Sequence, residues 1–134
     1  AEPRYLMGVG KPTDIVKSIR LGVDMFDCVM PTRNGRNGQI FTSRGTINIS
    51  NERYKNDHSL VDDKSEHAFG RMFSKAYLRH LFNVKEILGL RIASTLNLSY
   101  YISLIKTIRG TIDSGEFDKW SSSWLSKMEN QRGM

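Results

Sequence analysis

Asp27 is the residue of this chain whose surroundings most suggest chemistry. It stands in the apolar run Val23 to Met30, which contains β-branched, aromatic and sulfur side chains between Gly22 and Pro31. This pattern predicts a short strand that is buried on both faces. A buried carboxylate is costly unless it is paired, hydrogen-bonded or exposed at the strand end. Asp27 is therefore either a structural, ion-paired aspartate or a reactive carboxylate such as a nucleophile.

Two arginines follow this run and add a possible binding function. Arg33 and Arg36 stand three residues apart among two Asn-Gly pairs, which predict a loop with tight turns at positive φ. Planar guanidinium groups bind phosphates and base edges through two parallel hydrogen bonds. The pair suits a nucleic-acid substrate, and the alternative is an ordinary solvated basic loop.

The segment before Asp27 predicts the elements that would position it. Tyr5 to Gly10 is a second apolar run, and a helix is expected between Pro12 and Gly22, with Ile15 and Val16 on its apolar side. Strand, helix and strand form a βαβ unit, which belongs to α/β sheets or barrels. In such folds the active site forms at the carboxyl ends of the strands, where Asp27 stands.

A family resemblance rests on several motifs of the chain. Arg4 to Gly10 and Asp24 to Arg33 resemble the bacterial tRNA-guanine transglycosylases, also called queuine tRNA-ribosyltransferases. The resemblance covers most of the chain to about Phe117, through the further motifs Asn34–Gln39, Ile47–Ile49, Ala76–Leu81 and Glu86–Gly89. It implies the carboxyl-terminal part of a (β/α)8 barrel, with its last two parallel strands and their helices. The implied single partial domain has three segments, namely a βαβ segment at 1–38, a former zinc-binding insertion at 39–96 and carboxyl-terminal helices at 97–134.

The resemblance also implies an activity, which is a pentosyl transfer in queuosine modification of tRNA. In that reaction the wobble guanine of the anticodon is exchanged for preQ1 or queuine through a covalent ribosyl-aspartate. By resemblance Asp27 is the nucleophile, Tyr5 and Met7 line the base pocket, and Gly8 lets the heterocycle approach. The residues expected to hold the anticodon loop are Lys11, Arg33 and Arg36.

The length of the chain limits the activity that the resemblance implies. The chain has 134 residues, whereas a complete (β/α)8 barrel takes about 250. The six preceding strands, the family's other catalytic aspartate and most of the base pocket are not in this sequence. We therefore expect the isolated chain to be inactive, with an amino-terminal half-barrel chain or a homodimer as possible partners. The alternatives are a non-catalytic subunit that binds tRNA or another protein, and a non-functional gene remnant.

The family's zinc site is the clearest departure from the pattern. The family holds zinc with three cysteines and a histidine, and the matching positions here are Ser65, His67, Gly70 and Leu96. Structural zinc requires four thiolate or imidazole ligands in a tetrahedron, which this set does not provide. The sequence therefore predicts that no zinc cofactor is bound. His67 could still bind metal with His58 or His80, although scattered histidines are more often ordinary surface or core residues.

Composition is consistent with a cytoplasmic partner of tRNA. The net charge is +6, and the sequence pI is about 9.6, which favours association with RNA. The single cysteine, Cys28, excludes an internal disulfide and suits a small core residue in a reducing compartment. The sequence has no long apolar run and no signal-peptide pattern, so no membrane partner is expected.

The rest of the sequence predicts mainly helices. A hairpin is expected from Gln39–Ser43 and Thr46–Ser50, followed by a polar loop from Asn51 to Glu66. Apolar residues at spacings of three and four predict one long helix from about Arg71 to Leu88 and another from about Leu98 to Ile112. One or two amphipathic turns are expected after Asp118.

Overall fold

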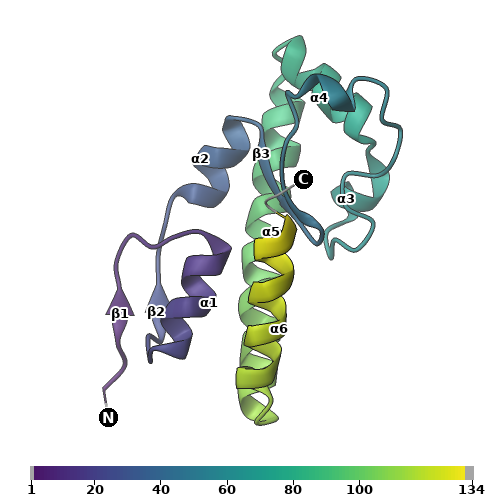
Figure 1. Cartoon of the computed structure of the whole chain (residues 1–134). Helices are drawn as coiled ribbons and strands as arrows, with labels where there is room; N and C mark the ends of the chain where they lie inside the picture. Colours follow the sequence, from purple (N-terminus) through teal and green to yellow (C-terminus); the bar gives the residue numbers. More distant parts are fainter. Residues whose placement is uncertain (1, 132–134) are drawn as a thin grey trace. The chain divides into compact units, whose positions relative to one another are not determined.

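The structure, a computed structural model, describes residues 2–131. It divides into two units, and Figure 1 labels helices and strands along the chain. The first unit contains the chain up to Met30 together with the chain from Leu104 onward, and the second contains Pro31–Ser103. Short strands alternate with helices at the start of the chain and helices dominate after it, so the α/β class predicted from the sequence is confirmed. The division into segments 1–38, 39–96 and 97–134 concerns the parent barrel and stays a prediction.

The first unit begins with the predicted βαβ arrangement. Strand β1 (Tyr5–Leu6) and strand β2 (Met25–Phe26) pair in parallel, with Tyr5 opposite Met25 and Leu6 opposite Phe26. Helix α1 (Pro12–Arg20) connects them, as Figure 1 shows. Pro12 stands in the first turn, where its missing N–H costs nothing, and Asp14 complements the positive end of the helix dipole.

The predicted strand from Val23 to Met30 is wrong in length and in burial. Only Met25 and Phe26 are in strand conformation, and the Met25 side chain is 48% exposed. Among the described residues this sheet has two strands, and two parallel strands cannot cover both of their own faces. The apolar run from Val23 to Met30 is typical of a strand that is covered on both faces by other elements, and this two-stranded sheet does not provide that cover.

Helix α6 (Phe117–Asn130) completes the first unit together with the last part of helix α5 (Ile87–Asp113). It packs against α1. Ile15 and Val16 of α1, Ile108 of α5 and Leu125 of α6 are buried. The amphipathic segment predicted after Asp118 is thus a helix of 14 residues.

The second unit begins with helix α2 (Met30–Arg36) and the predicted hairpin. Strands β3 (Gln39–Thr42) and β4 (Gly45–Asn48) pair in antiparallel fashion around the turn at residues 43 and 44. A single 3-10 turn, η1 (Glu52–Tyr54), interrupts the polar segment that follows.

The single helix predicted from Arg71 to Leu88 is wrong. The structure has α3 (Ala68–Met72), α4 (Lys75–Asn83) and the start of α5 instead. Phe73 is extended because its carbonyl accepts a hydrogen bond from the Val61 N–H, and the Ser74 side chain caps α4. Lys85, at φ 58°, separates α4 from α5. The helix predicted from Leu98 to Ile112 exists, but it begins at Ile87.

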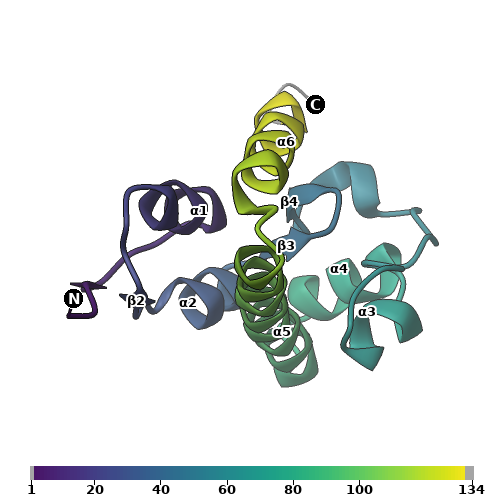
Figure 2. The ribbon, with the colours of Figure 1, turned by 90° about the horizontal axis from the view of Figure 1, so that it is seen from below.

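One apolar core holds the second unit together. It is formed by the hairpin, α4 and the first part of α5, which Figure 2 shows from below. Its buried members are Ile40, Ile49, Tyr54, Val61, Leu78, Leu81, Ile92, Ala93 and Leu96. In the part of the chain that the structure describes, no helix is long and apolar enough to cross a membrane.

Candidate functional site

Asp27 lies one residue beyond β2, and two groups from the β1 side hold its carboxylate. The Tyr5 hydroxyl donates a hydrogen bond of 2.6 Å to Asp27 Oδ1. The Gly8 backbone N–H donates a second bond of 3.0 Å to the same oxygen. Both donors bind Oδ1, and neither of these two hydrogen bonds involves Oδ2.

The strand register produces this arrangement. Tyr5 is opposite Met25, and Asp27 follows Met25 by two residues, just after the end of β2, so its side chain points to the same side as that of Met25. Gly8 follows the end of β1 with φ 74°, a left-handed conformation that glycine adopts without steric cost. Its N–H consequently reaches the carboxylate. The predicted position of Asp27 at the carboxyl end of a parallel strand is confirmed, and Gly8 lies just beyond the same end of the neighbouring strand.

The two donors also set the charge of the site. The hydrogen bond from Tyr5, followed by that from the Gly8 N–H, lowers the pKa of Asp27 below the ordinary aspartate value. The same hydrogen bond to Asp27 raises the pKa of the Tyr5 hydroxyl, so Tyr5 stays protonated and remains a donor. Asp27 is exposed, contrary to the predicted buried strand, and its charge is held by hydrogen bonds. An ionised, oriented carboxylate is suited to nucleophilic attack.

The other residues predicted near Asp27 belong to the same unit. Met7 follows β1 and its side chain is 74% exposed. Lys11 is exposed and directly precedes α1. Cys28 is half-buried, and its Sγ lies 3.7 Å from the Gly10 carbonyl oxygen, which suits a packed residue. The binding roles of Met7 and Lys11 stay predictions.

Arg33 and Arg36 belong to the second unit, and they lie on a helix rather than in the predicted loop. Both are exposed in α2 (Met30–Arg36). Pro31 suits the first turn of a helix, because its fixed φ is already helical. Of the glycines expected at positive φ, only Gly38 has it, at 85°. Gly35 is helical and buried.

Gly35 explains why this Asn-Gly pair does not make a turn. A Cβ placed on Gly35 would lie 3.0 Å from the Cα and N atoms of Ser94 in α5. The glycine therefore permits close approach of two helices. Asn37 ends the helix by donating from its side chain to the Arg33 carbonyl at 3.0 Å.

At the positions matching the family's zinc ligands, the side chains make other contacts. The Nδ1 atom of His67 accepts a hydrogen bond from the Phe69 N–H at 3.1 Å. Leu96 is buried in the apolar core, and Gly70 has no donor side chain. Among residues 2–131, no three His, Cys, Asp or Glu side chains come together as a metal would require.

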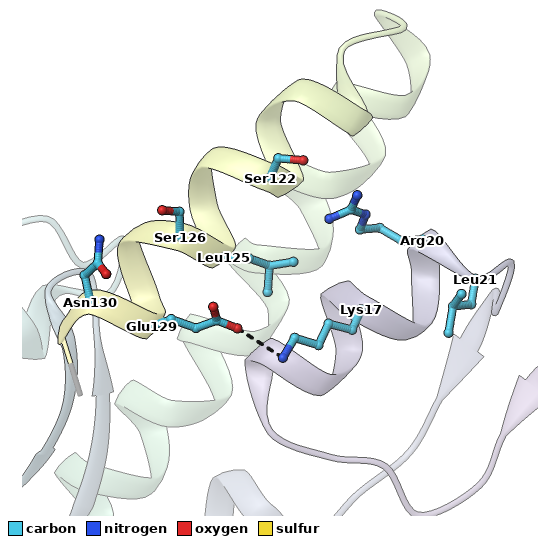
Figure 3. Close-up of a pocket in the computed structure, with 8 residues that line it drawn as sticks. All are labelled: Lys17, Arg20, Leu21, Ser122, Leu125, Ser126, Glu129 and Asn130. Atoms are coloured by element: carbon cyan, nitrogen blue, oxygen red, sulfur yellow. Dashed lines mark ion pairs between the residues drawn. The ribbon is translucent and has the colours of Figure 1, made fainter. Parts of the chain in front are cut away.

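The first unit also has an open groove between α1 and α6, shown in Figure 3. A salt bridge of 3.1 Å between Lys17 Nζ and Glu129 Oε1 crosses it. Its lining residues are Lys17, Arg20, Leu21, Ser122, Leu125, Ser126, Glu129 and Asn130. None of the predicted site residues lines this groove, so it is separate from the candidate site.

Two functional contacts were not predicted from the sequence. The Tyr5 hydroxyl was expected in a base pocket, whereas the structure makes it a donor to Asp27. Finding this contact would have required the register of the two strands. The second is Asn97, which is fully buried and hydrogen-bonded to three backbone groups of the second unit. A polar residue in the apolar pattern of a helix was the available clue.

Comparison with known proteins gives matches to one family. The family model described as Queuine tRNA-ribosyltransferase matches residues 1–130. The queuine tRNA-ribosyltransferase of Shewanella halifaxensis (strain HAW-EB4) is 54% identical over 125 residues, covering 93% of this chain and 33% of the relative. That of Syntrophobacter fumaroxidans (strain DSM 10017 / MPOB) is 49% identical over 131 residues, covering 98% of this chain and 35% of the relative. That of Francisella tularensis subsp. mediasiatica (strain FSC147) is 50% identical over 125 residues, covering 93% of this chain and 34% of the relative.

The chain thus spans about a third of the length of these curated relatives. The match extends over nearly all of its own residues and includes both strands of the candidate site. This chain belongs to the queuine tRNA-ribosyltransferase family.

Proposed function

We propose that this chain supplies the nucleophile-bearing part of a tRNA base-exchange enzyme. The observation that carries the proposal is the carboxylate of Asp27, held by Tyr5 and Gly8 at the carboxyl ends of two parallel strands. Family membership supports a transglycosylase-like function. The finer assignment, exchange of the wobble guanine for preQ1 or queuine, follows the family's reaction.

In the proposed reaction, Asp27 Oδ2 attacks the ribose carbon C1′ of the target nucleotide. A C1′–O bond forms as the bond from C1′ to the base nitrogen breaks, and its electron pair leaves with guanine, which takes up a proton. The incoming base then loses a proton, attacks C1′ and releases the Asp27 carboxylate. A carboxylate can capture an electron-poor sugar carbon and later leave, so it divides one difficult displacement into two steps.

Tyr5 and Gly8 act on the nucleophile in this scheme. Their hydrogen bonds keep Asp27 ionised and orient its free oxygen. Glycine at position 8 also leaves the backbone open, because nothing lies within 4 Å of where its Cβ would be. A flat base could therefore approach there, with Met7 and the Tyr5 ring as neighbours. Stacking of a base on an aromatic ring contributes about 1–3 kcal/mol.

The rest of the machinery must come from elsewhere. A two-stranded sheet suits the last two strands of a (β/α)8 barrel, and about two thirds of the relatives' length has no counterpart here. We propose that an amino-terminal part of the barrel, as the same or a separate chain, supplies the proton-transferring group and most of the base pocket. The 134-residue chain alone is accordingly inactive.

Complementation tests this function. The chain is combined with the part of the Shewanella halifaxensis relative that precedes the matched region, and tRNA carrying wobble guanine is added. We expect a covalent protein–tRNA adduct on denaturing gels, and its abolition by Asp27→Asn. Asp24→Asn is the matched control, because that carboxylate accepts from the Arg4 N–H in the same strand segment. An adduct of undiminished yield with Asp27→Asn would refute the nucleophile assignment.

A further inference from the structure

The second unit contains a closed loop where the family holds zinc. We propose that this segment, residues 61–75, folds without a metal ion, and that loop closure, a helix cap and apolar packing replace the zinc. The inference concerns the stability of the second unit and does not depend on base exchange. Four observations support it.

The first observation is that the loop is closed too tightly to hold two metal ligands. A Cβ on Gly70 would lie 2.5 Å from Ser65 Cβ and 2.8 Å from the Asp62 carbonyl oxygen. Two thiolates on one tetrahedral zinc, each about 2.3 Å from the metal, stand about 3.8 Å apart. Side chains at positions 65 and 70 therefore could not both extend toward a metal without opening the loop. Glycine at position 70 allows the closed form.

The second observation is that backbone and side-chain hydrogen bonds join the loop ends directly. The Asp62 N–H donates to the Gly70 carbonyl at 3.0 Å, and the Val61 N–H donates to the Phe73 carbonyl at 3.0 Å. The buried Asp62 carboxylate accepts from Ser43 N at 2.9 Å and from Ser43 Oγ at 2.6 Å, which ties the loop to the hairpin. In effect a carboxylate and backbone bonds make the connections that a metal would otherwise make.

The third observation concerns His67, the one residue of the four that could bind zinc. The His67 Nδ1 atom caps α3 by accepting a hydrogen bond from the Phe69 backbone N–H at 3.1 Å. The backbone N–H of His67 donates to Ser65 Oγ at 3.2 Å. Its ring packs edge-on against Phe69, with the centroids 4.5 Å apart. One nitrogen lone pair is thus already used, and the ring has an apolar contact. His67 acts here as a helix cap.

Apolar packing completes the replacement. Phe69 and Phe73 pack against the core that contains Leu96, and their ring centroids lie 5.6 Å apart. Tyr77 continues the row at 5.6 Å from Phe73. Leu96 is 3% exposed, so this position contributes buried apolar surface and no metal ligand.

Hydrogen exchange on the full chain tests the proposal. The backbone amides of Val61, Asp62, Gly70 and Phe73 are followed in EDTA and in a buffer with one equivalent of zinc chloride. We expect protection in both conditions, with exchange rates equal within about twofold. Protection that rises tenfold or more with zinc, or that is absent in both conditions, would overturn the proposal.

Two substitutions of His67 distinguish a helix-capping role of this side chain from a metal-binding role. Asparagine is a good N-cap residue, whereas alanine is not. Under the proposal His67→Asn keeps the protection of the Phe73 amide within about twofold, and His67→Ala lowers it about fivefold. Equal loss in both variants, together with protection that zinc raises in the wild-type chain but not in either variant, would show that His67 serves as a metal ligand.

Discussion

At the scale of single residues, the candidate site is defined by how one carboxylate is held. Tyr5 and the Gly8 N–H both donate to Asp27 Oδ1, and both bonds lower the pKa of the carboxylate. Asp27 therefore stays ionised at a lower pH than an ordinary aspartate. These two hydrogen bonds distinguish Asp27 from other surface carboxylates even though its side chain is exposed.

The pH dependence of adduct formation should report the Tyr5 hydrogen bond. Because Tyr5 is the largest cause of the lowered pKa of Asp27, Tyr5→Phe should raise that pKa. The rate of adduct formation is measured against pH with the chain combined with the amino-terminal part of the relative. The acid limb of this profile should consequently move to higher pH. Tyr77→Phe, a matched change in α4, should leave the limb in place. An unmoved limb in Tyr5→Phe would mean that the hydroxyl does not set the charge of Asp27.

Asp27 could be singled out from the sequence because a carboxylate in an apolar run is unusual. Its partner could not be predicted, since the Tyr5 hydroxyl reaches Asp27 only in the register that pairs Tyr5 with Met25. Register depends on packing across the sheet, which one pair of short strands does not specify. The burial of the strand before Asp27 was wrongly predicted for a different reason, since the two strands of this sheet do not cover both of their own faces.

At the scale of elements, Asn97 joins α5 to two other segments of the second unit. Its Oδ1 accepts from the Phe41 N–H at 3.0 Å, and its Nδ2 donates to the carbonyls of Pro31 and Gln39 at 3.0 and 2.9 Å. One buried amide thus satisfies backbone groups at the start of α2 and in β3. Such groups are costly to leave unpaired.

Asn97→Ala should lower the free energy of unfolding by about 3 kcal/mol, because three buried or partly buried backbone groups lose their partner. Chemical denaturation followed by circular dichroism measures this. Asn83→Ala, at the exposed end of α4, should change stability by less than about 0.5 kcal/mol. Equal effects of the two changes would show that the buried hydrogen bonds contribute little.

Gly35 offers a second test of how elements meet. Gly35→Ala should destabilise the second unit by about 1–3 kcal/mol, since its Cβ would lie 3.0 Å from the backbone of Ser94. Gly110→Ala is the matched control, because Gly110 is also helical but has nothing within 4 Å of its Cβ position. That change should stabilise the chain by up to about 1 kcal/mol. Thermal unfolding of both variants gives the comparison.

The elements themselves were partly predictable. Helix α1 and the β3–β4 hairpin follow local patterns of apolar residues and turn residues, and both occur as predicted. The break at Phe73 is not local, because that residue is held extended by pairing with Val61. Likewise α2 replaced a predicted loop because Gly35 packs against α5. The errors thus fall where tertiary contacts override local preference.

At the scale of the whole molecule, the net charge of +6 favours a polyanionic partner. Positive charge alone gives binding that depends on salt but not on sequence or structure of the RNA. Arg33 and Arg36 are exposed on one helix of the second unit, three residues apart, so they face the same side of α2. They are therefore the strongest candidates for a localised contact with tRNA phosphates.

A salt series distinguishes a localised contact from diffuse attraction. If each arginine neutralises one phosphate, Arg33→Ala and Arg36→Ala should each reduce the slope of log K against log salt by about 0.7–1. Arg91→Ala, an exposed arginine of α5 in the same unit, alters net charge equally and should leave the slope nearly unchanged. Binding of tRNA measured by fluorescence anisotropy between 50 and 200 mM salt, a range of about fourfold, would resolve the difference. Identical slopes for all three variants would indicate attraction by overall charge, with no defined arginine site on α2.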